Sequence, residues 1–200
     1  MKADLMRTKH EKIRVHILNS AIKVVGRHGY AKATMARIVE EAGVPYGSIY
    51  LYFHGHQDIL SKLLPMVNDT LRATIRERSG KAKTFMDHEA VSFDVIFEQA
   101  PAKFGKQRVF AEAPFFVPQA YDAYLERMAK SYIRLMHKCK QRGEISGVNE
   151  EDFGTIAYSL MGAKQFLVRK YIISKSEPCD VPPHVRRTYL GMVEKILLVV

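Results

Sequence analysis

The chain has 200 residues and is 47% hydrophobic, which is enough for one compact domain or two small ones. Its formal net charge of +10 suits a polyanionic partner. No apolar run approaches the roughly 18 residues of a membrane span, and the charged N-terminal segment does not resemble a signal peptide, so we expect a cytoplasmic protein with no membrane partner.

Positive charge is concentrated towards the N-terminus. The first 57 residues carry nine Lys or Arg and four Asp or Glu, a net charge of +5. The first of these basic residues are Lys2, Arg7, Lys9 and Lys12. They form either a solvated terminus or an arm that lies on phosphates or in a minor groove. The motif that follows favours the arm.

A first amphipathic helix is predicted from about residue 9 to residue 28. Its apolar positions recur at helical spacing: Ile13, Ile17, Leu18, Ala21, Ile22, Val24 and Val25. Gly29 ends this helix, and Tyr30 is expected to pack as core. The helix should brace the two short helices that follow, because these cannot bury enough surface alone.

The stretch TMARIVEEAGVPYGSIYLYF, residues 34–53, predicts two short helices joined by a tight turn. Thr34 can cap the first helix with its side-chain oxygen. Gly43 can adopt the left-handed conformation that ends a helix, and Pro45 presets the backbone for the second helix. This is the helix-turn-helix pattern, whose second helix enters the DNA major groove.

Four residues of the second helix should lie nearest to DNA: Tyr46, Gly47, Tyr50 and Tyr52. Gly47 has no side chain, so the helix can approach the duplex closely, and tyrosine hydroxyls can bond phosphate oxygens. Arg37 in the first helix can reach a phosphate or a guanine edge. Alternatively, Tyr50 and Tyr52 are partly core. We expect Tyr52 to be partly buried and Tyr50 to be the better contact.

The run AGVPYGSIYLYF, preceded by Gly29-Tyr30 and Ala33-Thr34, resembles the DNA-binding domain of TetR-type transcriptional regulators. The resemblance covers roughly the first third of the chain. It implies phosphate contacts at Thr34, Tyr50 and Tyr52. It also implies base contacts from both helices, at Ala36, Arg37, Tyr46, Gly47 and Ser48.

Three positions depart from the family pattern. Pro45 stands where a serine cap is usual, Met35 where threonine is frequent, and His56 where lysine is frequent. These changes bear on individual phosphate contacts and not on the fold, and Pro45 and His56 stay in the predicted DNA-binding set. The pair His54 and His56 lacks further metal ligands, so we expect a solvent or phosphate contact there.

Helical periodicity continues through the rest of the chain, and no segment alternates as a strand does. Helices are predicted at about residues 56–78, 85–100, 103–113, 120–142, 149–173 and 182–200, with a rigid turn at 113–119. The predicted fold is all-α with about nine helices. It consists of a three-helix DNA-binding head at residues 9–57 and a ligand-binding and dimerisation bundle at residues 58–200.

Aromatic and methionine residues are frequent between residues 85 and 171. Such stripes are more often core than pocket, yet they also suit a cavity for an apolar or aromatic ligand. The resemblance implies an effector pocket here. The candidate lining residues are Phe93, Phe97, Phe110, Phe115, Phe116, Tyr124, Met128, Tyr132, Met161 and Phe166.

A homodimer is predicted because one head reads only a short half-site. The last two long helices are the candidate interface, as the resemblance also implies. Their apolar residues exceed what one small bundle needs to cover, notably Leu160, Phe166, Leu190, Val193 and Leu197.

No catalytic signature is present, so we expect no enzyme, no catalytic residue and no cofactor. Cys139 and Cys179 lack metal-ligand spacing, which predicts no metal site. The favoured function is a DNA-binding repressor that a small apolar or aromatic effector releases from a double-stranded operator. The alternative is a helical ligand-binding or enzymatic protein without operator-specific DNA binding, which leaves the first fifty-odd residues unexplained.

Overall fold

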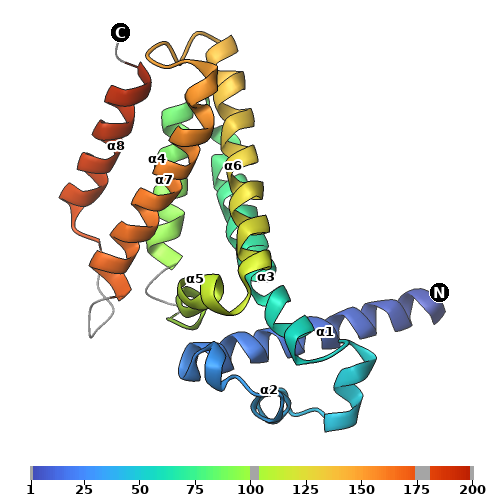
Figure 1. The fold of residues 1–200 in the computed structure, drawn as a ribbon. Helices are drawn as coiled ribbons and strands as arrows, with labels where there is room; N and C mark the ends of the chain where they lie inside the picture. The colour runs from blue at the N-terminus through green and yellow to red at the C-terminus, as the bar shows by residue number, and fades with distance from the viewer. Residues whose placement is uncertain (1, 100–103, 174–180, 199–200) are drawn as a thin grey trace. The chain divides into compact units, whose positions relative to one another are not determined.

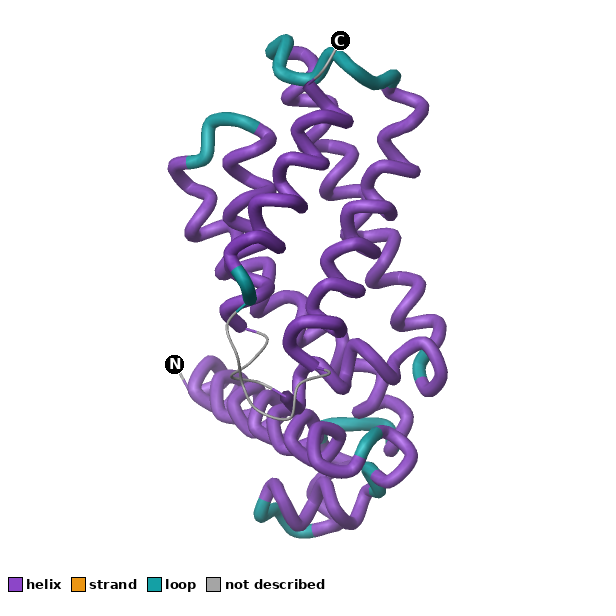
Figure 2. The backbone as a smooth tube through the Cα atoms, turned by 90° about the vertical axis from the view of Figure 1, so that its left-hand side faces the viewer, coloured by secondary structure: helices purple, strands orange, loops and turns teal. Residues whose placement is uncertain are grey.

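The computed structural model describes residues 2–99, 104–173 and 181–198, so Cys179 lies outside it. Every regular element in these residues is a helix, and no strand occurs among them (Figure 2). The predicted all-α class is therefore confirmed. The chain divides into two compact units: unit 1 comprises Met1–Asn68 and Phe104–Asp122, and unit 2 comprises Asp69–Lys103 and Ala123–Val200.

Unit 1 contains the predicted head together with two further segments. Its elements are α1 (Lys2–His28), η1 (Tyr30–Lys32), α2 (Met35–Ala42), η2 (Tyr46–Leu51), the start of α3 (His56–Arg78), α5 (Phe104–Phe116) and the start of α6 (Pro118–Gln141). The long helix α1 packs against both α2 and α5 (Figure 1). It begins at Lys2 and not near residue 9, so the basic lead-in is part of a helix.

The apolar stripe predicted for α1 is buried except at Ile13, which is half-buried, and Ile17, Ala21 and Val25 are fully enclosed. Side chains of α5 also hold Tyr30 in η1, the turn that follows α1. Glu112 accepts a hydrogen bond from the backbone N–H of Tyr30 at 2.8 Å, and the Phe116 ring stacks on Tyr30 with centroids 5.6 Å apart. Thus α5, which is remote in sequence, packs on the head.

The rigid turn predicted at residues 113–119 was wrong. Helix α5 continues through Pro114 to Phe116, and α6 begins at Pro118. Proline at a first helical position is favoured because its missing N–H would have no partner there. Backbone bonds from Val117 to Ala113 and from Tyr121 to Val117, at 2.9 and 3.0 Å, carry the chain across.

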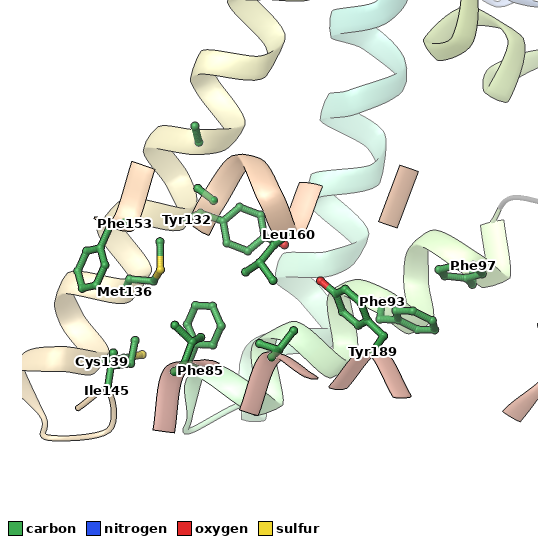
Figure 3. Close-up of a cluster of buried hydrophobic side chains, with 14 of the residues drawn as sticks. Phe85, Phe93, Phe97, Tyr132, Met136, Cys139, Ile145, Phe153, Leu160 and Tyr189 are labelled. Carbon is green, nitrogen blue, oxygen red and sulfur yellow. The ribbon is translucent and has the colours of Figure 1, made fainter. Parts of the chain in front are cut away.

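Unit 2 is built around one apolar core. Its elements are the remainder of α3 and α6, η3 (Ser79–Lys81), α4 (Phe85–Gln99), η5 (Glu150–Asp152), α7 (Phe153–Val168), η6 (Arg169–Ile173) and α8 (Pro183–Leu198). Figure 3 shows Phe93 beside Tyr189 in this core, with ring centroids 5.2 Å apart. The helix predicted at about residues 149–173 is divided, because the 3₁₀ turn η5 precedes α7 and the π-helical segment η6 follows it.

None of the helices in the described ranges is long and apolar enough to cross a membrane.

Candidate nucleic-acid interface

The first helix of the predicted motif, α2, is terminated by local interactions at both ends. Thr34 is its N-cap, and its hydroxyl accepts from the backbone N–H of Arg37 at 3.4 Å. Gly43 follows its last turn at φ 62° and ψ 31°, a left-handed conformation that favours glycine. Both predictions are confirmed, so α2 has a defined length of eight residues.

The second short helix of the motif is present as η2, and it is a 3₁₀ helix. It starts after Pro45, whose carbonyl accepts from both the backbone N–H and the hydroxyl of Ser48, at 3.0 and 2.7 Å. At its end, the N–H groups of Tyr52 and Phe53 both donate to the Ile49 carbonyl at 3.0 Å. Tight i→i+3 bonding of this kind is common in short helices.

The side chains of η2 and the residues after it separate into a buried and an exposed set. Ile49 is fully buried and Phe53 is 2% exposed, whereas Tyr46 and Tyr50 are each 53% exposed. The Tyr46 and Tyr50 rings are neighbours, with centroids 6.3 Å apart. Leu51 is exposed as well. The buried residues fix the segment to the head and leave the two tyrosines at the surface, where their hydroxyls can reach phosphates.

Gly47 lies between the exposed tyrosines and is itself exposed. A Cβ built on it would meet no atom within 4 Å, so no neighbour in the chain requires a glycine at this position. A molecule that approaches the backbone of η2 closely at this point would require a residue without a side chain. Of the other predicted contact residues, Thr34, Ala36, Arg37 and Pro45 are exposed.

Three histidines fasten the backbone of the motif. His10 donates to the Leu51 carbonyl at 3.2 Å, His16 to the Ala42 carbonyl at 2.9 Å, and His56 to the Ala33 carbonyl at 2.5 Å. His10 and His16 belong to α1, so α1 holds the ends of both helices of the motif. These contacts could not be predicted from the sequence. Every residue has a backbone carbonyl that can accept a hydrogen bond, so the residue types do not indicate which carbonyl a histidine will contact.

Three of the predicted contact residues are half-buried, namely Ser48, Tyr52 and His56. Tyr52 lies against His10, with ring centroids 4.5 Å apart. Its partial burial is as expected. Since the Nε2 of His56 already donates to a carbonyl, its predicted phosphate contact would have to come from the other ring nitrogen.

The acidic residue Glu41, at the end of α2, is neutralised locally. It accepts from Arg27 at 2.6 Å and is paired with Lys23 at 3.4 Å. The hydrogen bond from Arg27 holds the pKa of Glu41 below its ordinary value. Arg37 is tied by its guanidinium to the Lys32 carbonyl at 3.0 Å. This arrangement leaves the basic excess of the head to act on an external anion.

A hollow of about 480 Å³ lies between α1 and the turn that leads into η2. Its lining includes Lys9 and Lys12 of α1, together with Pro45, Ser48 and Tyr52. Both lysines are exposed. Two of the lead-in basic residues therefore stand next to the motif, on a helix and not on an extended arm.

Unit 2 contains a cavity of about 640 Å³ between α3, α4 and α6. Met128 and Tyr132 of the predicted pocket residues line it. The sequence reasoning missed its other lining residues, which are Asp69, Arg72, Ile75, Arg76, Ser79, His88, Glu89, Ser92, Ser131 and Leu135.

The other predicted pocket residues are distributed over both units. Phe93 and Phe97 are buried in the core of unit 2, and Met161 packs against that core. Phe110, Phe115 and Phe116 belong to α5 in unit 1. Tyr124 is half-buried. Phe166 is 74% exposed on α7.

A buried polar network lies beside the cavity. Lys164 on α7 is 2.6 Å from the carboxylate of Glu89 on α4, and both side chains are almost fully enclosed. The Glu89 carboxylate accepts from the hydroxyl of Tyr132 at 2.8 Å and from that of Tyr189. Burial, followed by the Glu89 charge, raises the pKa of Tyr132 to about 12. Burial alone would lower the pKa of Lys164, but the carboxylate outweighs it and the pKa is raised.

Of the residues predicted at a dimer interface, Leu160, Val193 and Leu197 are buried within unit 2 of the single chain, and Leu190 is half-buried. Exposed apolar side chains nevertheless recur on both helices. They are Tyr158 and Phe166 on α7, and Met192 and Ile196 on α8.

Comparison with known proteins agrees with this architecture. Residues 17–63 match the family described as bacterial regulatory proteins, tetR family. The chain is 24% identical over 192 residues to the uncharacterized HTH-type transcriptional regulator YfiR of Bacillus subtilis (strain 168), a match that covers 90% of each chain.

Two solved structures share the fold. A candidate TetR-family transcriptional regulator from Rhodococcus sp. superposes with a TM-score of 0.79 at 18% identity, over 94% of this chain and 99% of that one. FadR from Bacillus subtilis, in complex with stearoyl-CoA, gives a TM-score of 0.72 at 18% identity, over 92% and 97%.

The fold and the motif together define a DNA-binding regulator of the helix-turn-helix class. More narrowly, the family match of residues 17–63 and the description of the full-length relative as a transcriptional regulator support a TetR-type regulator. The relatives are regulators and not enzymes.

Proposed function

We propose that this regulator is a repressor that binds a double-stranded operator through α2 and η2. The observation that carries the proposal is the exposed set on η2, where Tyr46, Gly47 and Tyr50 stand clear of the head while Ile49 and Phe53 hold the segment in place. Tyrosine hydroxyls and the basic excess of the head would position the protein on phosphates. Such a protein would act in the cytoplasm, where bacterial DNA is held, and would have no catalytic activity.

The effector would bind in the cavity of unit 2. In support, the similar FadR structure contains stearoyl-CoA, so a protein of this fold can hold an acyl ligand. Helix α3 begins at His56, shortly after η2 ends at Leu51, and supplies the cavity residues Arg72, Ile75 and Arg76. The start of α3 is therefore close in sequence to the DNA-binding motif, and its later residues form one wall of the cavity. A ligand that prefers the DNA-incompetent state would shift the equilibrium away from operator binding.

The functional protein would be a homodimer. Tyr158 and Phe166 are eight residues apart on α7, and Met192 and Ile196 are four apart on α8, so each pair lies on one face of its helix. Large exposed apolar groups on neighbouring turns are typical of interaction surfaces. A two-fold axis would present two heads to half-sites about 34–36 Å apart.

The DNA-binding part of the proposal is tested by removing one hydroxyl. An operator would first be selected from a random duplex pool, and the enriched sequence should be a palindrome. Tyr50→Phe should then weaken operator binding by about 1–2 kcal/mol, because a bond to a phosphate oxygen is lost. Fluorescence anisotropy at several salt concentrations measures the affinity.

The matched control is Tyr158→Phe, because Tyr158 is an exposed tyrosine in unit 2 and its hydroxyl should not affect DNA binding. If Tyr50→Phe and Tyr158→Phe bind the operator as tightly as the unmodified chain, Tyr50 does not contact DNA. If no sequence is enriched and affinity does not fall with salt, the chain is not an operator-binding regulator.

A further inference from the structure

Three helices, α3, α4 and α6, each contribute residues to the wall of the cavity in unit 2. On α6 the lining residues are Met128, Ser131, Tyr132 and Leu135, which follow the i, i+3, i+4, i+7 pattern of one helical face. Helix α3 contributes two arginines, and α4 contributes Glu89 among others. The wall is thus apolar at some positions and strongly polar at others, and the polar positions determine which ligand it can accept.

The acidic residues that line the cavity have basic partners within the chain. Glu89 is paired with Lys164 at 2.6 Å, and Asp69 lies 3.5 Å from the guanidinium of Arg127. Burial, followed by the charge of Arg142, lowers the pKa of His88, which favours its neutral form. Each carboxylate of the cavity therefore has a basic partner within the chain, Glu89 in the interior and Asp69 at the exposed rim.

The basic groups of the cavity are not neutralised. Arg72 is half-buried, and its guanidinium donates to the hydroxyl of Ser131 at 3.2 Å. Neither Arg72 nor Arg76 has an ion pair with any carboxylate in the described part of the chain. The bond to Ser131 orients the Arg72 fork and leaves its remaining N–H groups available, which is the arrangement that binds an anion.

A second observation points to a polar ligand group in the same cavity. Ser79 lines the cavity and is only 8% exposed, yet its hydroxyl has no hydrogen-bond partner among the described residues. A buried hydroxyl without a partner is unfavourable, and a ligand oxygen would satisfy it. The apolar residues Ile75, Met128 and Leu135 would then enclose the remainder of the ligand.

We propose that the effector is an amphipathic organic anion, with a carboxylate held by Arg72 and an apolar body held by Ile75, Met128 and Leu135. This inference rests on the proposed function for its regulatory role and on the cavity alone for its chemistry. An uncharged apolar molecule would leave Arg72 without a counter-charge, so it should bind more weakly.

The probe is decanoate, compared with decanol, which has the same chain without the charge. Isothermal titration of the full chain without DNA should show that decanoate binds at least about tenfold more tightly. Arg72→Gln should weaken decanoate binding by about 10- to 100-fold, the range expected when a hydrogen bond to a charged group is lost. Binding of decanol should be nearly unchanged, and Arg72→Lys should retain part of the preference.

The matched control is Arg134→Gln. Arg134 donates to the same Ser131 hydroxyl at 3.4 Å, but it is exposed and does not line the cavity. Its replacement should leave decanoate binding unchanged. Circular dichroism and thermal unfolding of each variant would identify a folding defect. If decanoate fails to bind at millimolar concentration, binds no better than decanol, or is unaffected by Arg72→Gln, the proposal is overturned.

Failure of the proposed function would be seen separately. If decanoate binds through Arg72 but has equal affinity with and without saturating operator, the ligand class is supported and effector release fails, because coupling between two sites must be reciprocal. If the chain binds no operator, the DNA-binding proposal fails while the titration still decides the ligand class.

Discussion

At the scale of single residues, the pairing of Lys164 with Glu89 places two charges in the interior of unit 2. Each charge is almost fully enclosed, and each has the other as its oppositely charged partner. Two tyrosine hydroxyls, of Tyr132 and Tyr189, complete the hydrogen bonds of the carboxylate. The network joins α4, α6, α7 and α8, so a substitution in it should lower the stability of the whole of unit 2.

Replacing Lys164 with methionine should destabilise the protein by about 3–5 kcal/mol, because Glu89 would remain buried without its partner. Urea unfolding measures this loss. The double variant Glu89→Gln/Lys164→Met should recover much of it, since Gln can still accept from the two tyrosines. Equal losses in the single and double variants would show that the ion pair is not what stabilises this region.

At the scale of elements, the helix-turn-helix motif uses its two glycines for different purposes. Gly43 has a left-handed backbone with open space around it, so its requirement is conformational. Gly47 has no positive φ, and a Cβ added to it would meet no neighbour, so the chain itself imposes no requirement there. The two positions therefore separate what the fold requires from what the proposed DNA contact would require.

Gly43→Ala should lower the free energy of unfolding by about 1–2 kcal/mol, the cost of a left-handed alanine. Gly47→Ala should leave stability unchanged or slightly raised, but should weaken operator binding roughly tenfold, which is the size of one lost base contact. Urea unfolding and operator anisotropy on both variants give the comparison. Full operator affinity in Gly47→Ala would mean that η2 does not approach DNA closely at this residue.

At the scale of the whole molecule, a single chain leaves apolar side chains exposed in places where a second copy could cover them. Phe166 on α7 is 74% exposed, and Met192 and Ile196 on α8 are each close to half exposed. Phe115 on α5 is 82% exposed as well, but it belongs to unit 1. The homodimer proposal assigns the first group and not Phe115 to the interface.

Phe166→Glu should therefore convert a dimer into a monomer at micromolar concentration, because a charge would be buried without a partner in the interface. Light scattering coupled to size-exclusion chromatography measures the mass. Phe115→Glu, at a similarly exposed phenylalanine, should leave the mass unchanged. A monomeric unmodified chain, or a dimer that survives Phe166→Glu, would contradict the assignment.

Local interactions made several features predictable from the sequence. The Thr34 cap and the Gly43 turn depend on residues within a few positions of each other, so their residue types were sufficient. Helical periodicity likewise identified the buried stripe of α1, including Ile17 and Ala21. The basic composition and the motif together indicated a DNA-binding regulator.

Only the tertiary structure decided which apolar and charged groups meet. Periodicity shows that a helix has an apolar face but not what covers it, so Phe93 in the core and Phe115 at the surface looked alike. Lys164 and Glu89 are 75 positions apart, and a charge on an apolar helix face was the one available sign of a buried pair. Arg72 became a candidate anion site only when folding placed it in a cavity whose acidic groups are already paired.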